Sequence, residues 1–230
     1  MNQQSRDILD HAMQRGQAAL SEYDAKRFLS GYGLPVPPVH LCRTPEEAAA
    51  AADHIGFPVV AKACSPHLLH KSEHNAVHLG LASGEQVQRA CRQMADEGHA
   101  DIDGYLVEAM VTGRRELVAG MTRDPQFGPC VMLGAGGVFT EVLADTVFRV
   151  APFDRAEALE MSTELRSAGM LDAFRGDAAV DREALAAILL AVGEIGATCD
   201  AVAEIDINPL IIQPDGSLTA ADALIVLGEK

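Results

Sequence analysis

The segment from Val202 to Val226 constrains the fold more than any other part of the chain. Apolar and polar residues alternate along 202–212, the turn Pro214-Asp-Gly follows, and a second apolar stretch runs along 218–226. Because residues two apart share one face of a strand, this pattern predicts an antiparallel hairpin with a buried face and a polar face. Helix-like and strand-like segments alternate before it, with further hairpins, so we expect a mixed α+β fold and not a doubly wound parallel sheet.

The polar face of this hairpin predicts a cation site. Glu204, Asp206 and Asn208 share one face of the first strand, and Ile205 and Ile207 share the other. Carboxylate and amide oxygens that converge in this way suit Mg²⁺, a hard cation that takes few protein oxygens and completes its shell with water and phosphates. The alternative is a hairpin whose polar residues simply face solvent.

The length of the turn decides whether this site can form. A three-residue loop over 214–216, with Gly216 in the left-handed conformation, puts Asn208 directly opposite Asp222, with both side chains on one face. A two-residue loop would shift the register by one and separate them. The first register brings the two oxygen ligands together, and the second does not.

Charge and composition exclude several classes of partner. The chain has 230 residues, with 18 basic and 33 acidic side chains, a net charge of −15 and a pI near 4.8. A protein that binds nucleic acid through its phosphates, or docks on an anionic membrane, would carry a basic surface, so we expect neither partner. No apolar run approaches the ~20 residues of a membrane-spanning helix, and no signal peptide is visible. The five scattered cysteines fit reduced thiols, so we expect a soluble cytoplasmic protein.

The order of the predicted elements suggests two lobes. Ser21 and Thr44 are suitable N-caps, and Thr44-Pro-Glu-Glu has the form of a capping box that opens a helix over 45–55. The sequence Asp101-Ile-Asp-Gly marks a boundary after a helix predicted over 84–97. We therefore predict an N-terminal helix, an N-terminal lobe and a C-terminal lobe, over residues 1–21, 22–103 and 104–230.

Cations are concentrated in one part of this acidic chain. Two of its four lysines, Lys62 and Lys71, lie there together with His67, His70, His74 and His78. Lys62 ends an apolar strand and is either a surface charge or a point charge for a phosphate. The histidine spacing fits one face of a metal-binding helix, or a loop in which one histidine is a nucleophile with Lys71 and Ser72 beside it. A polar loop with incidental histidines is the third interpretation.

Two further features could contact an anion. Gly134-Ala-Gly-Gly lies between two predicted strands, and is either a tight turn or a place where backbone N–H groups approach an anion. Arg149 is a cation in the apolar sequence Val147-Phe-Arg-Val. It is either an edge residue whose guanidinium reaches solvent or a phosphate partner.

Taken together, these stretches resemble the ATP-grasp domains of NDP-forming acyl-CoA synthetases, a family that includes the β subunits of ADP-forming acetyl-CoA synthetases. The likeness runs from Ser21 to Leu227. It is carried by GFPVVAKACSPHLLHKSEHNAVHLGL at 56–81, RDPQFGPCVMLGAGGVFTEVLADTVFRVAP at 123–152, FRGDAAVD at 174–181, and EIDINPLI at 204–211 followed by Asp222.

The resemblance implies an ATP-grasp fold, in which two α+β lobes enclose a nucleotide cleft. It implies the reaction acid + CoA + ATP ⇌ acyl-CoA + ADP + phosphate, through a phosphohistidine on a mobile loop. ATP or ADP and Mg²⁺ would be the cofactors. The partner would be a CoA-binding α subunit in a heterotetramer, and that subunit would bind most of the CoA and the carboxylic acid.

The resemblance also assigns roles to individual residues. His70 matches the phosphorylated histidine, with Lys71 beside it, and Lys62 matches the lysine on the nucleotide phosphates. Asn208 and Asp222 match the Mg²⁺ ligands. The other positions expected to line the nucleotide site are Glu108 and Met110 in the hinge 106–110, Glu116, Glu141, Arg149 and the glycine-loop residues Gly134, Gly136 and Gly137.

The chain departs from this family at three places. Asn75 and Ala76 replace two usual glycines, the hinge reads Val-Glu-Ala-Met where Val-Gln-Glu-Met is common, and Leu224 replaces a usual arginine. The substitutions at Ala76 and Leu224 motivate a second hypothesis, a nucleotide-sensing regulatory module without catalysis. The histidine spacing motivates a third, a metal-binding protein.

Overall fold

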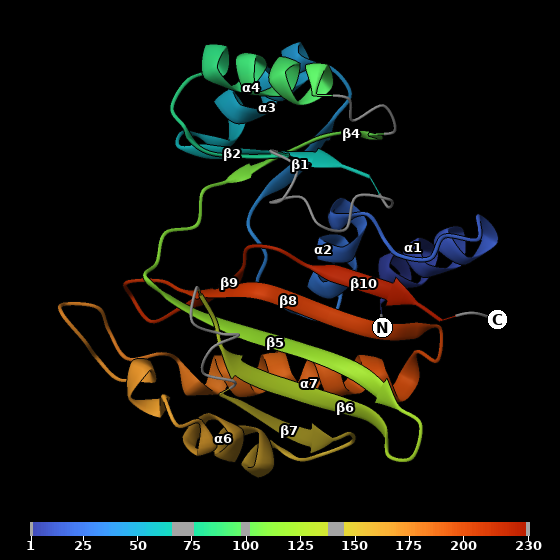
Figure 1. Cartoon of the computed structure of the whole chain (residues 1–230), viewed down its shortest axis with the longest axis vertical. Coiled ribbons are helices and arrows are strands. Elements are labelled where there is room, and N and C mark those ends of the chain that lie inside the picture. The colour runs from blue at the N-terminus through green and yellow to red at the C-terminus, as the bar shows by residue number, and fades with distance from the viewer. Residues whose placement is uncertain (1, 66–75, 98–101, 138–144, 229–230) are drawn as a thin grey trace. The chain divides into compact units, whose positions relative to one another are not determined.

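The computed structural model describes residues 2–65, 76–97, 102–137 and 145–228 (Figure 1). Its helices and strands confirm the α+β class. In chain order the elements are α1 (Gln3–Gln14), α2 (Glu22–Ser30), β1 (Val39–Cys42), α3 (Pro45–Ile55), β2 (Val59–Cys64), β3 (Val77–Leu81), α4 (Gly84–Asp96), β4 (Gly104–Ala109), β5 (Arg115–Asp124), β6 (Gly128–Ala135), β7 (Thr146–Val150), α6 (Arg155–Glu164), the 3₁₀ helix η2 (Ala168–Leu171), α7 (Arg182–Thr198), β8 (Val202–Ile212), β9 (Leu218–Ala220) and β10 (Leu224–Leu227). Among these described residues, no helix is both long and apolar enough to cross a membrane.

Contacts divide the chain into two units whose boundaries differ from the predicted ones. The smaller unit contains Ala19–Asp24 and Pro37–Met110, and the larger unit contains Met1–Ala18, Ala25–Val36 and Val111–Lys230. The predicted boundary at residue 104 separates β4 from its partners, whereas β4 pairs with β1 and β2 and so belongs to the smaller unit. Helix α1 belongs to the larger unit and is not a separate N-terminal domain.

The smaller unit is built on an antiparallel sheet with the strand order β1-β4-β2-β3. Helices α3 and α4 pack on one face of this sheet, and small and medium apolar side chains form the core between them (Figure 1). Lys62, Leu106 and Glu108 alternate with the core residues along β2 and β4, so they point to the opposite face. They are buried there as well.

The helix starts of the smaller unit follow the sequence signals. The Thr44 hydroxyl accepts a hydrogen bond from the Glu47 N–H at 3.1 Å, and Pro45 occupies the first turn. The Glu47 carboxylate accepts from the Arg43 N–H at 2.8 Å, where a capping box would use the N–H of Thr44. Half of the predicted capping box is therefore present.

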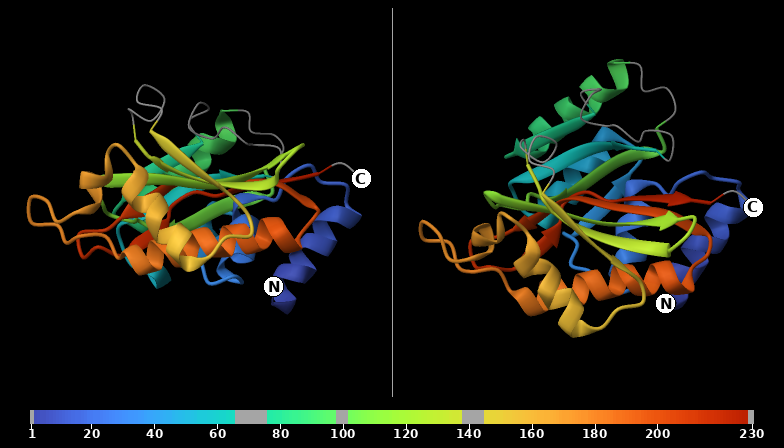
Figure 2. Two further views of the ribbon diagram at one scale, coloured as in Figure 1. Left: turned by 90° about the horizontal axis from the view of Figure 1, so that it is seen from below. Right: turned by 60° about the horizontal axis from the view of Figure 1, so that its bottom comes forward.

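The larger unit is built on an antiparallel sheet with the strand order β10-β8-β5-β6-β7, and β9 also pairs with β8. Helices α6 and α7 lie on one face of this sheet (Figures 1 and 2). The buried side chains on that face include Met121, Val131, Leu133, Ile205 and Ile207. Alternation therefore places the polar residues of β8 on the other face.

The C-terminal hairpin has the predicted three-residue loop. The Gln213 N–H donates to the Ser217 carbonyl at 2.8 Å, and Gly216 has φ +87°. The returning strand differs from the prediction, because it is divided into β9 and β10 by a bend over 221–223. The pairs Leu210↔Ala220 and Asp206↔Leu224 lie on either side of this bend and keep one register.

A bulge in β8 accounts for this bend. Leu117 of β5 pairs with Leu210, and Ala119 pairs with Ile207, so β8 has one residue more than β5 in this interval. The extra residue falls at the Asn208–Pro209 sequence. Proline has no N–H to donate to a ladder and occurs in sheets mainly at edges and bulges. The bulge therefore sets where Asn208 lies along the strand.

The segment from η2 to α7 is hydrogen-bonded to the start of β5. The Arg115 guanidinium is buried and donates hydrogen bonds to the carbonyl oxygens of Met170, Asp172 and Ala178, at 3.1, 2.9 and 2.6 Å. The hairpin loop packs against the same segment, because a Cβ on Gly216 would lie 2.1 Å from the Ala179 carbonyl oxygen. Glycine is therefore required at 216 because the backbone is left-handed there and because a side chain would collide with the neighbouring backbone.

Candidate functional site

Lys62, on β2 of the smaller unit, is a buried residue. The residue is 5 % exposed and lies between Val77 of β3 and Leu106 of β4. Its ammonium nitrogen lies 2.6 Å from a carboxylate oxygen of Glu22 and 2.8 Å from one of Glu108. The surface-charge interpretation is therefore wrong, and Lys62 is a buried cation held by two carboxylates.

The sequence interpretation missed Glu22 as part of this cluster. Glu22 is the first residue of α2 and is 3 % exposed. From the sequence it is an acidic residue after the Ser21 cap, and the structure confirms that cap, since the Asp24 N–H donates to the Ser21 hydroxyl at 3.2 Å. Forty residues separate Glu22 from Lys62, so no local pattern links them.

The hinge residues form the end of β4 and the residue after it. Glu108 pairs with Val39 of β1 and Val60 of β2. The N–H groups of Ala109 and Met110 each donate at 3.1 Å, to the carbonyls of Pro38 and Pro58 respectively. A nucleobase at this hinge would therefore be recognised through other groups of the segment, because these two N–H groups already donate to backbone carbonyls.

Asn208 and Asp222 lie opposite one another in the larger unit. The ladder pairs on both sides of them share one register, which confirms the arrangement that the turn predicts. The Asp222 carboxylate accepts the Ala223 N–H at 2.8 Å. These two positions supply an amide oxygen and a carboxylate, which are donors that suit Mg²⁺.

The neighbourhood of these two residues favours a cation. Burial raises the pKa of Asp206, and the carboxylates of Glu204 and Asp222 raise it further. The same negative charge would attract a divalent ion. Among the described residues, no three His, Cys, Asp or Glu side chains form a metal cluster. This donor set fits an ion that takes few protein ligands and shares the rest with phosphates and water.

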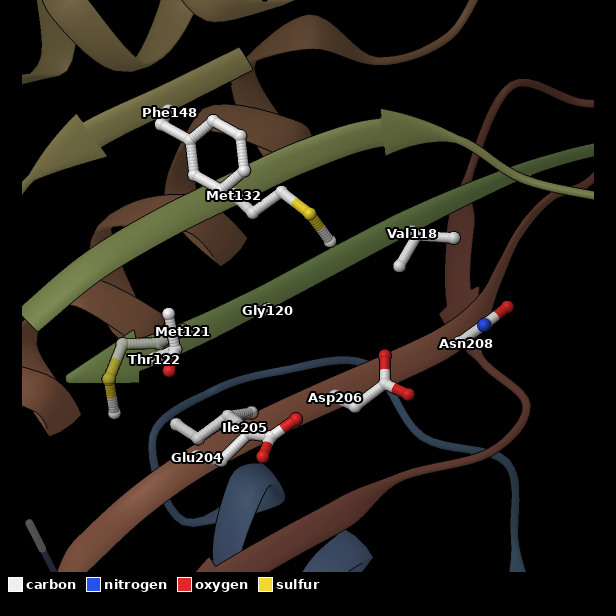
Figure 3. Close-up of a pocket in the computed structure, with 10 residues that line it drawn as sticks. All are labelled: Val118, Gly120, Met121, Thr122, Met132, Phe148, Glu204, Ile205, Asp206 and Asn208. Carbon is white, nitrogen blue, oxygen red and sulfur yellow. The ribbon is translucent and has the colours of Figure 1, made fainter. Parts of the chain in front are cut away.

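A pocket of about 340 Å³ lies on the same face of the larger sheet (Figure 3). The acidic residues of β8 lie on one side of β5, and Met132 and Phe148 lie on the other. Between them Gly120 adds no side chain, and a Cβ there would lie 2.5 Å from the Ile205 carbonyl oxygen. The pocket therefore combines an apolar side with a polar row made of Glu204, Asp206 and Asn208.

The glycine loop is explained by close packing against β5 and β7. The Gly136 N–H donates to the Glu116 carbonyl at 2.7 Å, and a Cβ on Gly136 would lie 2.8 Å from the Glu116 carbonyl carbon. A Cβ on Gly134 would lie 2.9 Å from the Thr146 methyl group, and Gly137 has φ +83°. Gly134 lies within β6 and pairs with Val118 and Thr146, and Gly136 continues that ladder to Glu116, so the tight-turn interpretation is wrong for these two glycines. The Gly136 N–H is not presented to an anion here.

The Asp145 carboxylate, just before β7, accepts hydrogen bonds from the segment after α6. Burial would raise the pKa of this carboxyl, but hydrogen bonds from the Ser167 hydroxyl and from the N–H groups of Arg166 and Ser167 outweigh that effect and lower it. The two N–H groups donate at 2.9 and 2.8 Å. The carboxylate thereby ties β7 to the segment that follows α6.

Arg149 is paired with helix α6. Its guanidinium makes a bidentate contact with the Glu164 carboxylate, at 2.6 and 3.0 Å, and lies 3.6 Å from Glu160. The Glu164 hydrogen bonds raise the pKa of Arg149. In this structure the guanidinium contacts the carboxylates of α6, and a role for Arg149 at a phosphate stays a prediction.

Other expected site residues lie outside the described residues: His67, His70, Lys71, His74, Asn75 and Glu141. Three of the departures from the family do lie within them: Ala76, the hinge described above and Leu224. Ala76 is fully buried in the core of the smaller unit, and its carbonyl accepts the Ala63 N–H at 2.9 Å. Leu224 is half-buried on β10 and pairs with Asp206. Ala76 thus fills core space that a glycine would leave empty.

Comparisons with known proteins agree with the α+β fold described above. A sequence model of the ATP-grasp domain matches residues 11–227. The chain is 39% identical over 228 residues to acetate–CoA ligase (ADP-forming) I subunit beta of Pyrococcus furiosus, covering 97% of each chain. It is 41% identical, with a TM-score of 0.93, to a chain of the acetyl-coenzyme A synthetase 1 of Candidatus Korarchaeum cryptofilum solved with coenzyme A and Ca-AMPCP, covering 97% of this chain and 100% of that one.

A second structure of the Korarchaeum enzyme contains coenzyme A and Mg-AMPPCP, with its phosphohistidine segment pointing towards the nucleotide-binding site. It matches with a TM-score of 0.86 and 40% identity, over 97% of this chain and 100% of that one. The likeness therefore extends over nearly the whole of each chain and includes both sequence and fold. The chain belongs to the ATP-grasp family, among the ATP-grasp subunits of the ADP-forming CoA ligases.

Proposed function

We propose that the chain is the nucleotide-binding, phosphoryl-transferring β subunit of an ADP-forming acetyl-CoA synthetase, which catalyses acid + CoA + ATP ⇌ acyl-CoA + ADP + phosphate. The observation that carries the proposal is the placement of Asn208 opposite Asp222, beside Asp206. These are the residues that the family resemblance assigns to Mg²⁺. Their register follows independently from the three-residue turn.

The family resemblance assigns residues of each unit to the nucleotide. Asn208 and Asp222 of the larger unit would hold Mg²⁺, which offsets charge on the phosphates during transfer. Lys62 of the smaller unit would provide a point charge for the phosphates. The apolar side of the pocket, with Met132 and Phe148, suits the flat face of a nucleobase.

The transferred group would be received by His70. A neutral imidazole nitrogen of His70 would form a bond to the γ-phosphorus while the bond from that phosphorus to its bridging oxygen breaks. ADP would leave with the electron pair of that bond. Lys71 would hold the phosphoryl oxygens. The phosphoryl group would then pass to the partner subunit, and the reverse sequence would form ATP.

The partner would be a CoA-binding α subunit, in a heterotetramer of two α and two β chains. The Pyrococcus relative is itself named as a beta subunit, and the Korarchaeum structures contain coenzyme A. In the proposed division of work, the α subunit binds CoA and the carboxylic acid. The α subunit would therefore decide which acid is used.

The test is phosphoryl labelling of the purified chain mixed with the α subunit from the same organism. We expect radiolabelled ATP with Mg²⁺ to give an acid-labile, alkali-stable label on the wild-type chain, and no label on His70→Asn. His78→Asn is the matched control, because His78 lies on β3 in the same region and should retain the label. Asp222→Asn should weaken binding of the Mg²⁺ nucleotide.

Two results would overturn parts of the proposal. A wild-type chain that binds Mg²⁺ nucleotide but takes no label with the α subunit would leave the nucleotide-sensing module as the better description. Labelling that persists in His70→Asn would exclude His70 as the acceptor.

A further inference from the structure

The bend that carries Asp222 interrupts the regular ladder of the C-terminal hairpin. β9 ends at Ala220, and pairing with β8 resumes at Leu224, which lies opposite Asp206. Residues 221–223 lie between the two strands. Peptide groups that leave a ladder inside a protein need other hydrogen-bond partners. The partners of this bend therefore decide where the backbone of Asp222 lies.

Two of these partners are backbone carbonyl groups. The Ala220 N–H donates to the Pro35 carbonyl at 2.9 Å, and the Ala221 N–H donates to the Pro209 carbonyl at 3.0 Å. Pro209 follows Asn208 in the bulge of β8. The second hydrogen bond therefore joins the bend to the segment that carries the other predicted Mg²⁺ ligand.

A further partner is the side chain of a buried lysine. Lys26 lies on α2, is 0 % exposed, and donates a hydrogen bond from its ammonium to the Ala221 carbonyl at 2.8 Å. Both residues belong to the larger unit. The nitrogen of the peptide group that contains this carbonyl is the backbone nitrogen of Asp222. Because the donor is charged, this bond is stronger than one between neutral groups, and it fixes that peptide.

The position of this peptide determines the position of the Asp222 carboxylate. The carboxylate accepts the N–H of the next residue, Ala223, at 2.8 Å, so its orientation follows the local backbone. Mg²⁺ requires near-ideal octahedral geometry, with ligand oxygens at about 2.0–2.1 Å. Groups that orient a metal ligand therefore contribute to metal affinity although they do not coordinate the ion.

We propose that Lys26 is a positioning residue for the Mg²⁺ site: its ammonium holds the bend so that the Asp222 carboxylate and Asn208 can bind one ion. This inference rests on the proposed function, in which these two residues hold Mg²⁺. In this role Lys26 acts through the backbone of Ala221. Loss of the ammonium therefore weakens binding of the Mg²⁺ complex of a nucleotide more than binding of the metal-free nucleotide.

The test is titration calorimetry of ADP with purified variants, once with excess Mg²⁺ and once with EDTA. Lys26→Met keeps the length of the side chain and removes the donor. It should lower the affinity for ADP in Mg²⁺ by about tenfold, the lower end of the range for groups that orient a metal ligand. The affinity in EDTA should change by less than about twofold. The ratio of the two affinities is the quantity that reports on the metal site.

Arg123→Met is the matched control for a general loss of structure. The Arg123 guanidinium donates to the carbonyls of Val202, Gly196 and Cys199, at 2.7, 2.8 and 2.8 Å. These contacts also join a cationic side chain to backbone carbonyls of the larger unit, but they lie at the end of α7 and the start of β8. Arg123→Met should lower the Tm and leave the ratio of affinities within about twofold of wild type.

Three results would overturn the positioning role. The first is an equal loss of affinity with and without Mg²⁺ in Lys26→Met, the second is an unchanged affinity in both conditions, and the third is a fall in the ratio as large in Arg123→Met. If Lys26→Met fails to fold, Lys26→Gln decides by the same ratio, because it keeps an N–H donor on a shorter side chain. Its ratio should fall, but by less than that expected for methionine.

The wild-type titrations separate this inference from the proposed function. A wild-type chain that binds no ADP in either condition, or binds it no better with Mg²⁺, refutes the proposed nucleotide site. A wild-type chain whose affinity rises with Mg²⁺, together with a Lys26→Met variant whose affinity rises equally, refutes the positioning role and leaves the proposed function intact.

Discussion

Replacement of Lys62 with methionine should destabilise the smaller unit strongly. The substitution keeps the length of the side chain but removes the ammonium that lies 2.6 Å from Glu22 and 2.8 Å from Glu108. These side chains are at most 6 % exposed, so water does not replace the lost cation. Breaking a buried ion pair by removing one partner costs about 3–5 kcal/mol, because a buried charge is left uncompensated. At about 2–4 °C per kcal/mol for a chain of this size, the Tm should fall by about 6–20 °C.

Thermal and urea unfolding followed by far-ultraviolet circular dichroism measures this change, since the chain has no tryptophan for fluorescence. The matched control is Arg92→Met, which removes an exposed cation 3.2 Å from Glu46 in the same unit. Exposed pairs contribute little, so its Tm should stay close to that of wild type. Adding Glu108→Gln to Lys62→Met should recover part of the loss, because one uncompensated carboxylate becomes neutral. A fall of less than about 3 °C in Lys62→Met, or one equal to that of Arg92→Met, would refute the reasoning.

Three other substitutions test the larger unit by circular dichroism melts. The pKa of Asp206 is raised, so the ionised form of this residue lowers the stability of the fold at neutral pH. Asp206→Asn should therefore raise the Tm at pH 8. This gain should fade as the pH falls towards about 4. The pKa of Asp145 is lowered, so its ionised carboxylate stabilises the fold fully above about pH 4, and this stabilisation is lost as the pH falls through the lowered value. Asp145→Asn should therefore lower the Tm at pH 7 and have less effect in acid. Gly216→Ala should cost about 2 kcal/mol or more, because φ is +87° and the new Cβ would lie 2.1 Å from the Ala179 carbonyl oxygen.

Each of these predictions has a specific contrary result. A Tm–pH curve that runs parallel to that of wild type, in either aspartate variant, would contradict the direction of the pKa shift assigned to that residue. An unchanged Tm in Gly216→Ala would contradict the close packing of the hairpin loop. A variant such as Asp215→Asn, at the exposed tip of the same loop, provides the comparison for that measurement.

Local signals predicted the parts of the fold that depend on neighbouring residues. The Thr44 cap and the proline after it are local, and α3 begins and ends at the residues that the sequence indicates. The turn at Gly216 is local as well, and it fixed the register that brings Asn208 and Asp222 together. The division of the returning strand was not predicted, because it depends on how β8 pairs with β5 around Pro209, and those strands are far apart in sequence.

The partners of charged side chains were the least predictable part of the site. From its place at the end of an apolar strand, Lys62 was either a surface charge or a phosphate contact. The structure shows it buried and hydrogen-bonded to Glu22, 40 residues away. The strand pattern left Arg149 as an edge residue or a phosphate partner, and only the family resemblance placed it at the nucleotide site. In the structure its guanidinium contacts Glu164 on the next helix. Residue type and spacing indicate that a charge needs a partner; tertiary packing decides which partner it finds.

The charges of the described residues make a divalent cation the main source of positive charge that the proposed site can offer a nucleotide. The sequence assigned Lys62 and Arg149 to the phosphates, yet Lys62 contacts two carboxylates and Arg149 is held by those of α6. Beside Asn208 and Asp222, the pKa of Asp206 is raised mainly by burial and further by the carboxylates of Glu204 and Asp222. Phosphates placed near these residues would be repelled unless a cation lay between them. The proposed dependence on Mg²⁺ therefore rests on how the individual cations and carboxylates are paired, and not on the net charge of −15.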